Sequence, residues 1–198
     1  MGFPAMRIRE FGEYRKLARV DEIGRRCLAN NGFDGILTII GVLMGSYVAG
    51  IREPRIVLST GLATCMAMGI SGFWGAYMAE SAERKHALRE LELAMLTDLG
   101  DTKQARASRF AVVVISLIDG LSPLVAGMAG LIPFLFAHLF TDIRYVFLAA
   151  LGLSLVGLFG LGVFLARVAR EKVIPAGMRM IVAGLVCVGL SFLINTKG

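Results

Sequence analysis

Hydrophobic positions along this chain gather into long unbroken runs. Residues 56–79 hold no charged side chain across 24 positions, and residues 145–166 hold none across 22. A helix needs about 20 apolar residues to cross the hydrocarbon layer of a membrane. The runs that predict transmembrane helices span 33–51, 56–79, 110–137, 145–166 and 178–196. We therefore expect an all-α integral membrane protein with five transmembrane helices.

Two features interrupt this pattern. Residues 10–30 place apolar and basic side chains near helical spacing, which predicts an amphipathic helix on anionic membrane lipid, and Asn30-Asn31-Gly32 should end it. The third run contains Pro123 and Pro133, so we expect it to be kinked or partly unwound. The predicted organisation is a cytoplasmic amphipathic segment, 1–31, and a membrane domain, 32–196, with a helical cytoplasmic insert at 80–109.

The positions of basic residues predict the orientation. The amino-terminal segment and the connections after the second and fourth spans hold 17 Lys and Arg residues, whereas the other side holds 4. Basic residues are enriched in cytoplasmic loops. The amino terminus should therefore lie in the cytoplasm, and the carboxyl terminus should lie outside.

The first four spans contain an internal repeat. Asp34-Gly35-Ile36 precedes Asp119-Gly120-Leu121 by 85 residues, and the same offset relates other glycines of the two halves. Both halves begin on the cytoplasmic side, so the repeat is a parallel one of two helix hairpins, and the fifth helix is additional. Repeated membrane hairpins are typical of transporters.

Composition agrees with a membrane protein and excludes several classes of site. Hydrophobic residues make up 56% of the chain and charged residues 18%. The net charge of +6 would suit nucleic acid, but its placement fits membrane topology, so we expect no nucleic-acid partner. The three cysteines are far apart and predict neither a zinc site nor a disulfide. Known enzyme motifs are absent, so we expect a protein that is not an enzyme.

Asp34 and Asp119 are the sharpest candidates for function. Each falls at or inside an apolar run, where an ionised carboxylate costs at least about 2.5 kcal/mol and usually faces a cavity or an ion path. The alternative is a helix N-cap. Asp119 is followed by Ser122-Pro123, where an unwound backbone and a hydroxyl would help to hold a cation. The alternative there is a packing kink.

A second candidate lies on the helix that leaves the second span. Glu83, His86 and Glu90 are spaced so that they share one face, and carboxylate with imidazole suits Fe²⁺, Mn²⁺ or Zn²⁺. The alternative is a solvated helix with ion pairs such as Glu80–Arg84 and His86–Glu90.

The chain resembles the vacuolar iron transporter family. The likeness rests on four ordered stretches, which are Asp34 to Thr38 with Gly41 and Gly45, Ser71 to Glu83, Gly127 to Pro133, and Arg179-Met180 with Gly184. It implies a homodimer that moves Fe²⁺ or Mn²⁺ out of the cytoplasm along a path between the protomers. It also implies that Asp34 binds metal, with partial support for Glu83 and Glu90.

Two residues depart from the family pattern. This chain has Gly72 where the family has Met, and Ala76 where the family has the Glu of Gly-Glu-Tyr. Both of those family residues handle metal. Met68, Met78 or Glu80, about one turn away, would substitute for them.

The sequence therefore predicts a divalent metal exporter of the cytoplasmic membrane, driven by proton exchange, with no permanently bound cofactor. Asp34 and Asp119 would serve as intramembrane sites for cations or protons, and His86 with its two acidic neighbours would gather metal at the cytoplasmic mouth. The alternatives are a transporter of the same fold with another cargo and a non-transporting membrane scaffold or partner subunit.

Overall fold

The long elements of the protein are all α-helices. The computed structural model describes residues 20–100 and 102–195. The helices are α2 (Val20–Val48), α3 (Pro54–Met95), α4 (Lys103–Leu135), α5 (Ile143–Ala169) and α6 (Val173–Asn195), with a short 3-10 helix, η1 (Ala137–Leu139). Five helices in these ranges are long and apolar enough to cross a membrane, and each predicted run falls on one of them. The prediction of an all-α, multi-pass membrane protein is confirmed.

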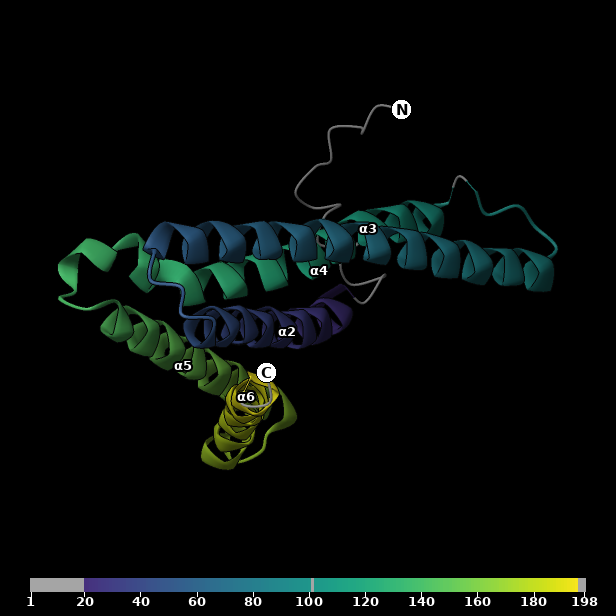
Figure 1. The fold of residues 1–198 in the computed structure, drawn as a ribbon. Helices are drawn as coiled ribbons and strands as arrows, with labels where there is room; N and C mark the ends of the chain where they lie inside the picture. The colour runs from purple at the N-terminus through teal and green to yellow at the C-terminus, as the bar shows by residue number, and fades with distance from the viewer. Residues whose placement is uncertain (1–19, 101, 196–198) are drawn as a thin grey trace.

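Helix α4 lies at the centre of the bundle. It packs against α3 on one side and α2 on another, whereas α5 packs against α6 and touches α4 and α2 less extensively. Figure 1 shows α3 and α4 running side by side, with the second half of α3 projecting well past α2. The residues on α2, α3 and α4 are therefore the ones that the fold can bring together.

The core forms where α2 crosses its neighbours. Ile39 and Leu43 of α2 are buried with Leu131 of α4 and Phe147 of α5 in one cluster. On another side of α2, Ile36, Ile40 and Met44 pack around Leu158 of α5 in a second cluster. These β-branched and long apolar side chains fix two faces of α2 and leave its other positions for polar contacts.

The expected break at Asn30-Asn31-Gly32 is wrong, because α2 continues through these residues without interruption. Gly32 is buried, and a Cβ atom at this position would lie 3.5 Å from Leu161 of α5. Asn31 also finds acceptors for its amide within the bundle. Tertiary contacts thus outweigh the weak helix propensity of Asn and Gly. Residues 10–19 of the predicted amphipathic helix lie outside the described residues.

The expectation of a partly unwound third span is also wrong. Helix α4 is continuous across Pro123 and Pro133 and ends at Leu135. Pro123 has no N–H, so the carbonyl of Asp119 loses its helical donor. The carbonyl of the preceding residue, Ile118, accepts a hydrogen bond from the Ser122 hydroxyl. The helix therefore passes the proline with one backbone carbonyl left without its usual partner.

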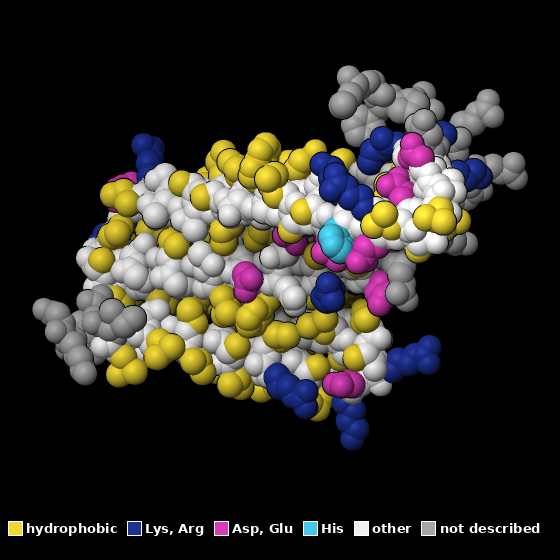
Figure 2. Space-filling view, turned by 90° about the vertical axis from the view of Figure 1, so that its right-hand side faces the viewer, with side chains coloured by type: hydrophobic (Ala, Val, Ile, Leu, Met, Phe, Trp, Pro, Cys, Tyr) yellow, Lys and Arg dark blue, Asp and Glu magenta, His cyan; other side chains and the backbone are white. Residues whose placement is uncertain are grey.

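The outer surface is largely apolar. Ile70 and Trp74 of α3 are 68% and 62% exposed, and Val156 of α5 is 67% exposed. Figure 2 shows hydrophobic side chains spread over one face, with most charged side chains gathered toward one end of it. Such a surface is suited to lipid or to another apolar protein face.

Candidate functional site

Asp34 and Asp119 both lie in the interior of helices. Asp34 is in the middle of α2, and Asp119 is in the middle of α4. The alternative interpretation of either residue as an N-cap is therefore wrong, because an N-cap stands just before the first turn of a helix. Each carboxylate needs another explanation for its place in an apolar helix.

Asp34 belongs to an unpacked face of α2, which it shares with Thr38, Gly41 and Gly45. Asp34 is exposed, and the Thr38 hydroxyl donates to the Asp34 carbonyl at 2.7 Å. A Cβ atom at Gly41 or Gly45 would meet nothing within 4 Å. Residues three and four apart lie on one helix face. A carboxylate and two glycines therefore form an open stripe, which we call the Asp34 face.

Asp119 lies in a different environment, in contact with α2. It is half-buried, and its Oδ1 accepts a hydrogen bond of 2.5 Å from the Asn31 amide. The Cys27 thiol lies near the Asp119 side chain. Asn31 in turn donates to the backbone carbonyl of Cys27 at 3.1 Å. These three residues, which we call the Asp119 cluster, link α2 to α4.

The partners of Asp119 were missed by the sequence analysis. A signal was present, because Cys27 and Asn31 are four residues apart and so share one face of a helix. The prediction that Asn31 breaks the helix concealed this spacing. The contact that joins Asn31 to Asp119 spans 88 residues of sequence, so no local pattern contains it.

Close packing of α3 on α4 gives Gly72 a structural reason. A Cβ atom at Gly120 would lie 2.6 Å from the Gly69 carbonyl oxygen, and one at Gly72 would lie 3.0 Å from the Asp119 carbonyl oxygen. The backbones of the two helices therefore meet directly. A Cβ atom at position 72 would make a tight contact, so a larger side chain there requires the α4 backbone to give by a few tenths of an ångström.

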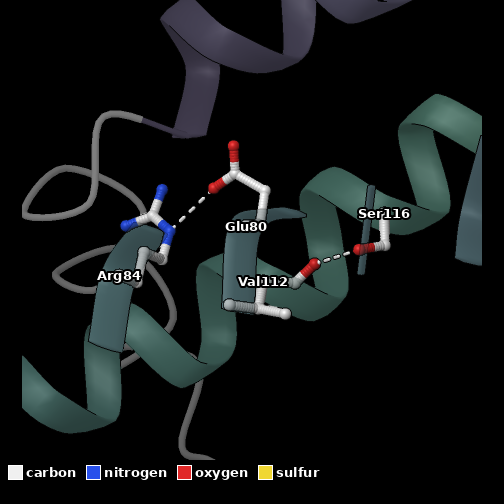
Figure 3. Close-up of polar contacts among 4 residues, drawn as sticks. All are labelled: Glu80, Arg84, Val112 and Ser116. Carbon is white, nitrogen blue, oxygen red and sulfur yellow. Dashed lines mark hydrogen bonds and ion pairs between the residues drawn. The ribbon is translucent and has the colours of Figure 1, made fainter. Parts of the chain in front are cut away.

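Glu80 is held by an ion pair on α3. Its Oε2 lies 2.9 Å from the Arg84 Nε, and the side chains of Glu80 and Arg84 are only 24% and 16% exposed. Figure 3 shows this pair beside α4, where the Ser116 hydroxyl donates to the Val112 carbonyl at 2.6 Å. The pair predicted on this helix is thus present, and it keeps the Glu80 carboxylate near the bundle.

The other predicted pathway residues are dispersed. Met68 packs against the core cluster around Leu43, whereas Met78 is 59% exposed on α3. Ser122 is buried and bonded to its own helix. The structure therefore places Met68 beside the core and Met78 on the surface, and it leaves a role for these residues as a prediction.

The predicted metal site on the projecting half of α3 is open to solvent. His86 Nδ1 and Glu90 Oε2 are 3.8 Å apart, both side chains are 71% exposed, and Glu83 is exposed as well. Among the residues described, no three His, Cys, Asp or Glu side chains are close enough to hold one metal ion. The structure brings His86 and Glu90 together, which agrees with the alternative of a solvated helix with ion pairs. A metal-binding role for Glu83, His86 and Glu90 stays a prediction.

Comparisons with known proteins identify the family. The model of the VIT family matches residues 31–110, which cover most of α2, all of α3 and the start of α4. An uncharacterized protein of Methanocaldococcus jannaschii, MJ0645, is 30% identical over 177 residues, which are 88% of this chain and 90% of that protein. The chain therefore belongs to the VIT family, and its activity falls within membrane transport of metal ions.

Proposed function

We propose that the protein exports a divalent transition metal, Fe²⁺ or Mn²⁺, from the cytoplasm in exchange for protons. The metal is the transported substrate. The proposed orientation has the amino terminus in the cytoplasm, in accord with the 17 basic residues assigned to that side and 4 to the other. Membership of the VIT family supports the general activity.

The observation that carries the proposal is the exposure of Asp34. An ionised carboxylate that faced lipid would carry a cost of at least about 2.5 kcal/mol. The face it shares with Gly41 and Gly45 has open space in a single copy of the chain. A second copy that covers this face would enclose the carboxylate and remove the cost. Two Asp34 side chains would then approach one cation path between the protomers of a homodimer.

The other residues of the pathway have supporting roles in this proposal. Asp119 and Ser122 would supply the second polar position in the membrane, and Glu80, Met68 and Met78 stay candidates for the route on α3, although they lie in different surroundings. His86 and its acidic neighbours Glu83 and Glu90 collect metal at the cytoplasmic mouth. The exposure of this group suits weak binding with rapid release, because water competes for every ligand.

Flux measurements test the proposal directly. Purified protein in liposomes should move Fe²⁺ and Mn²⁺, and the initial rate should depend on an imposed pH gradient. Co²⁺ and Zn²⁺ serve as the competing cargoes. Because residue 72 is Gly and supplies no thioether, a preference for another ion would favour the same fold with a different cargo. The absence of flux for all four ions would favour the non-transporting scaffold.

A cross-linking experiment tests the homodimer separately. In a background without native cysteines, Gly45→Cys should form a disulfide between two copies, because a two-fold interface brings the same face of each protomer together. Gly152→Cys on α5, where a Cβ atom also meets nothing within 4 Å, is the matched control. Equal cross-linking at the two positions would contradict a specific interface at the Asp34 face.

A further inference from the structure

A groove lies between the beginning of α2 and the first half of α4, and its walls are mostly apolar. Its volume is about 340 Å³. The apolar lining consists of Val20, Gly24, Leu28, Phe110, Val114 and Ile118, and the charged lining consists of Asp21 and Arg25. Leu28 is 41% exposed, so the groove opens to the outside of the bundle. We call it the α2–α4 groove.

Two glycines place this groove at the same level as a known position on α3. Gly24 of α2 and Gly72 of α3 both approach the middle of α4. A Cβ atom at Gly24 would lie 2.8 Å from Ile118, and one at Gly72 would lie 3.0 Å from the carbonyl oxygen of the next residue, Asp119. The beginning of α2 and the part of α3 that follows Gly72 are therefore side by side with the same turn of α4.

The aromatic residues of α3 indicate where this level lies in the membrane. Trp74 and Tyr77 are 62% and 38% exposed, and their ring centroids are 6.2 Å apart. Exposed Trp and Tyr side chains gather where the hydrocarbon meets the lipid headgroups. Arg25 follows Gly24 directly, so its guanidinium lies at the height of the headgroups. The apolar wall of the groove extends from there into the hydrocarbon.

The charge at the mouth of the groove favours an anion. Arg25 is exposed, and within residues 20–100 and 102–195 it forms no ion pair. Asp21, the acid of the lining, already has an interaction partner. Arg106 lies four residues before Phe110, on the face of α4 that lines the groove, and adds positive charge nearby. A phosphate at the mouth would therefore meet the Arg25 guanidinium, whose planar set of N–H donors matches phosphate oxygens.

We propose that the α2–α4 groove binds one phospholipid with a net negative headgroup. The headgroup phosphate lies at Arg25, and part of one acyl chain lies along Leu28, Val114 and Ile118. Basic pockets between transmembrane helices bind anionic headgroups in this way. A zwitterionic headgroup fits less well, because its own cation would lie close to Arg25. The site needs neither metal nor transport, so it stands apart from the proposed function.

The test is fluorescence quenching of the full chain by lipids with brominated acyl chains. Trp74 is the only Trp of the chain, and in the wild type it reports on the lipid beside α3 at the level of the groove. In a Trp74→Phe background, Leu28→Trp reports on the groove itself. Vesicles contain brominated phosphatidylglycerol in phosphatidylcholine, or the reverse. The groove reporter should favour the anionic lipid about fivefold, the factor expected for one basic residue beside an anionic headgroup, and Trp74 should favour neither lipid.

Two neighbouring arginines supply the matched variants. Arg25→Gln should remove the preference at the groove reporter, whereas Arg26→Gln should retain it, because Arg26 is exposed but does not line the groove. Equal effects of the two substitutions, or the same preference at both reporters, would mean a general attraction of lipid to basic residues and would overturn the proposal. Much weaker quenching of the groove reporter than of Trp74 by both lipids would mean that protein covers the groove, and would overturn it as well.

Native mass spectrometry keeps the proposal testable if Leu28→Trp does not fold. The wild-type chain, released from detergent after reconstitution with both lipids, should retain one phosphatidylglycerol per chain. Arg25→Gln should lose this lipid and Arg26→Gln should keep it. The absence of retained lipid in the wild type would overturn the proposal.

Discussion

The two Asp-Gly steps of the chain occupy opposite environments, although they share sequence. At Asp34-Gly35 the glycine packs against Pro123, with its Cβ position 2.5 Å from the Pro123 carbonyl oxygen, and the carboxylate points away from the bundle. At Asp119-Gly120 the glycine packs against α3, and the carboxylate bonds to α2. In both steps the glycine permits close helix packing, and the position of the helix in the bundle decides where the acid points.

This difference separates two kinds of intramembrane acid. Helix α4 has neighbours on several sides, so a polar side chain in its middle meets another helix. Helix α2 is packed on two faces and open on a third, so an acid on the third face needs a partner from outside the protomer. Metal handling is therefore expected at the open acid, and protein-internal chemistry is expected at the enclosed one.

The largest expected effect is on flux, from Asp34→Asn. The substitution removes the charge of the Asp34 side chain and keeps its size. If Asp34 lines the cation path, the initial rate of Mn²⁺ flux in liposomes should fall at least about tenfold, which corresponds to about 1.4 kcal/mol in the activation free energy. Glu53→Gln, an exposed acid between α2 and α3, is the control and should retain the wild-type rate. A normal rate in Asp34→Asn would mean that Asp34 does not line the cation path, and the proposed difference in role between Asp34 and Asp119 would be wrong.

A large effect on stability is expected at the glycine beside the enclosed acid. Gly120→Ala places a Cβ atom against the Gly69 carbonyl, and overpacking of this kind costs about 1–3 kcal/mol. Gly75→Ala on α3, where a Cβ atom meets nothing within 4 Å, should instead be neutral or stabilising by up to about 1 kcal/mol. Thermal unfolding in detergent measures both changes. Equal shifts in Tm would mean that α3 and α4 are not in backbone contact.

A moderate effect is expected when the link to α2 is cut. Asn31→Leu leaves the Asp119 carboxylate without its amide donor, and an unsatisfied buried polar group costs about 1–3 kcal/mol. Asn30→Leu, at the exposed neighbouring position, is the matched control and should change stability by less than about 0.5 kcal/mol. The free energy of unfolding of the two variants would agree if the Asp119 cluster contributed nothing.

The smallest effect is expected on the projecting half of α3. His86→Ala removes an exposed i,i+4 pair that contributes about 0.3–0.5 kcal/mol at most, so stability should hardly change. Calorimetric titration with Mn²⁺ then gives the sharper comparison. Replacement of Glu83, His86 and Glu90 together by Ala should weaken binding to this region, and an unchanged affinity would leave only the ion-paired helix.

The fold was predictable because a membrane imposes a strong local rule. Any chain segment that crosses hydrocarbon needs about 20 apolar residues, so runs such as 145–166 identify their helices without knowledge of the tertiary structure. The continuation of the second span into a charged helix was also predicted, and α3 does continue past residue 79 to Met95.

The polar contacts could not be predicted in the same way. Asn31 belongs to the Asn30-Asn31-Gly32 step, which was expected to end a helix. Its amide is satisfied by Asp119, which is 88 residues away, and only the packed bundle brings the two together. For the same reason the sequence identified Asp34 and Asp119 as equivalents of one another, whereas the structure surrounds them differently. The internal repeat that relates them stays a prediction.

The direct contact between Gly72 and the Asp119 backbone bears on how family members diverge. A larger residue at the position of Gly72 would bring a Cβ atom to 3.0 Å from the carbonyl oxygen of residue 119, so α3 and α4 would have to give by a few tenths of an ångström at this level. The size of residue 72 and the spacing of α3 and α4 are therefore linked, so a substitution at this position acts on helix packing as well as on the side chain that it introduces.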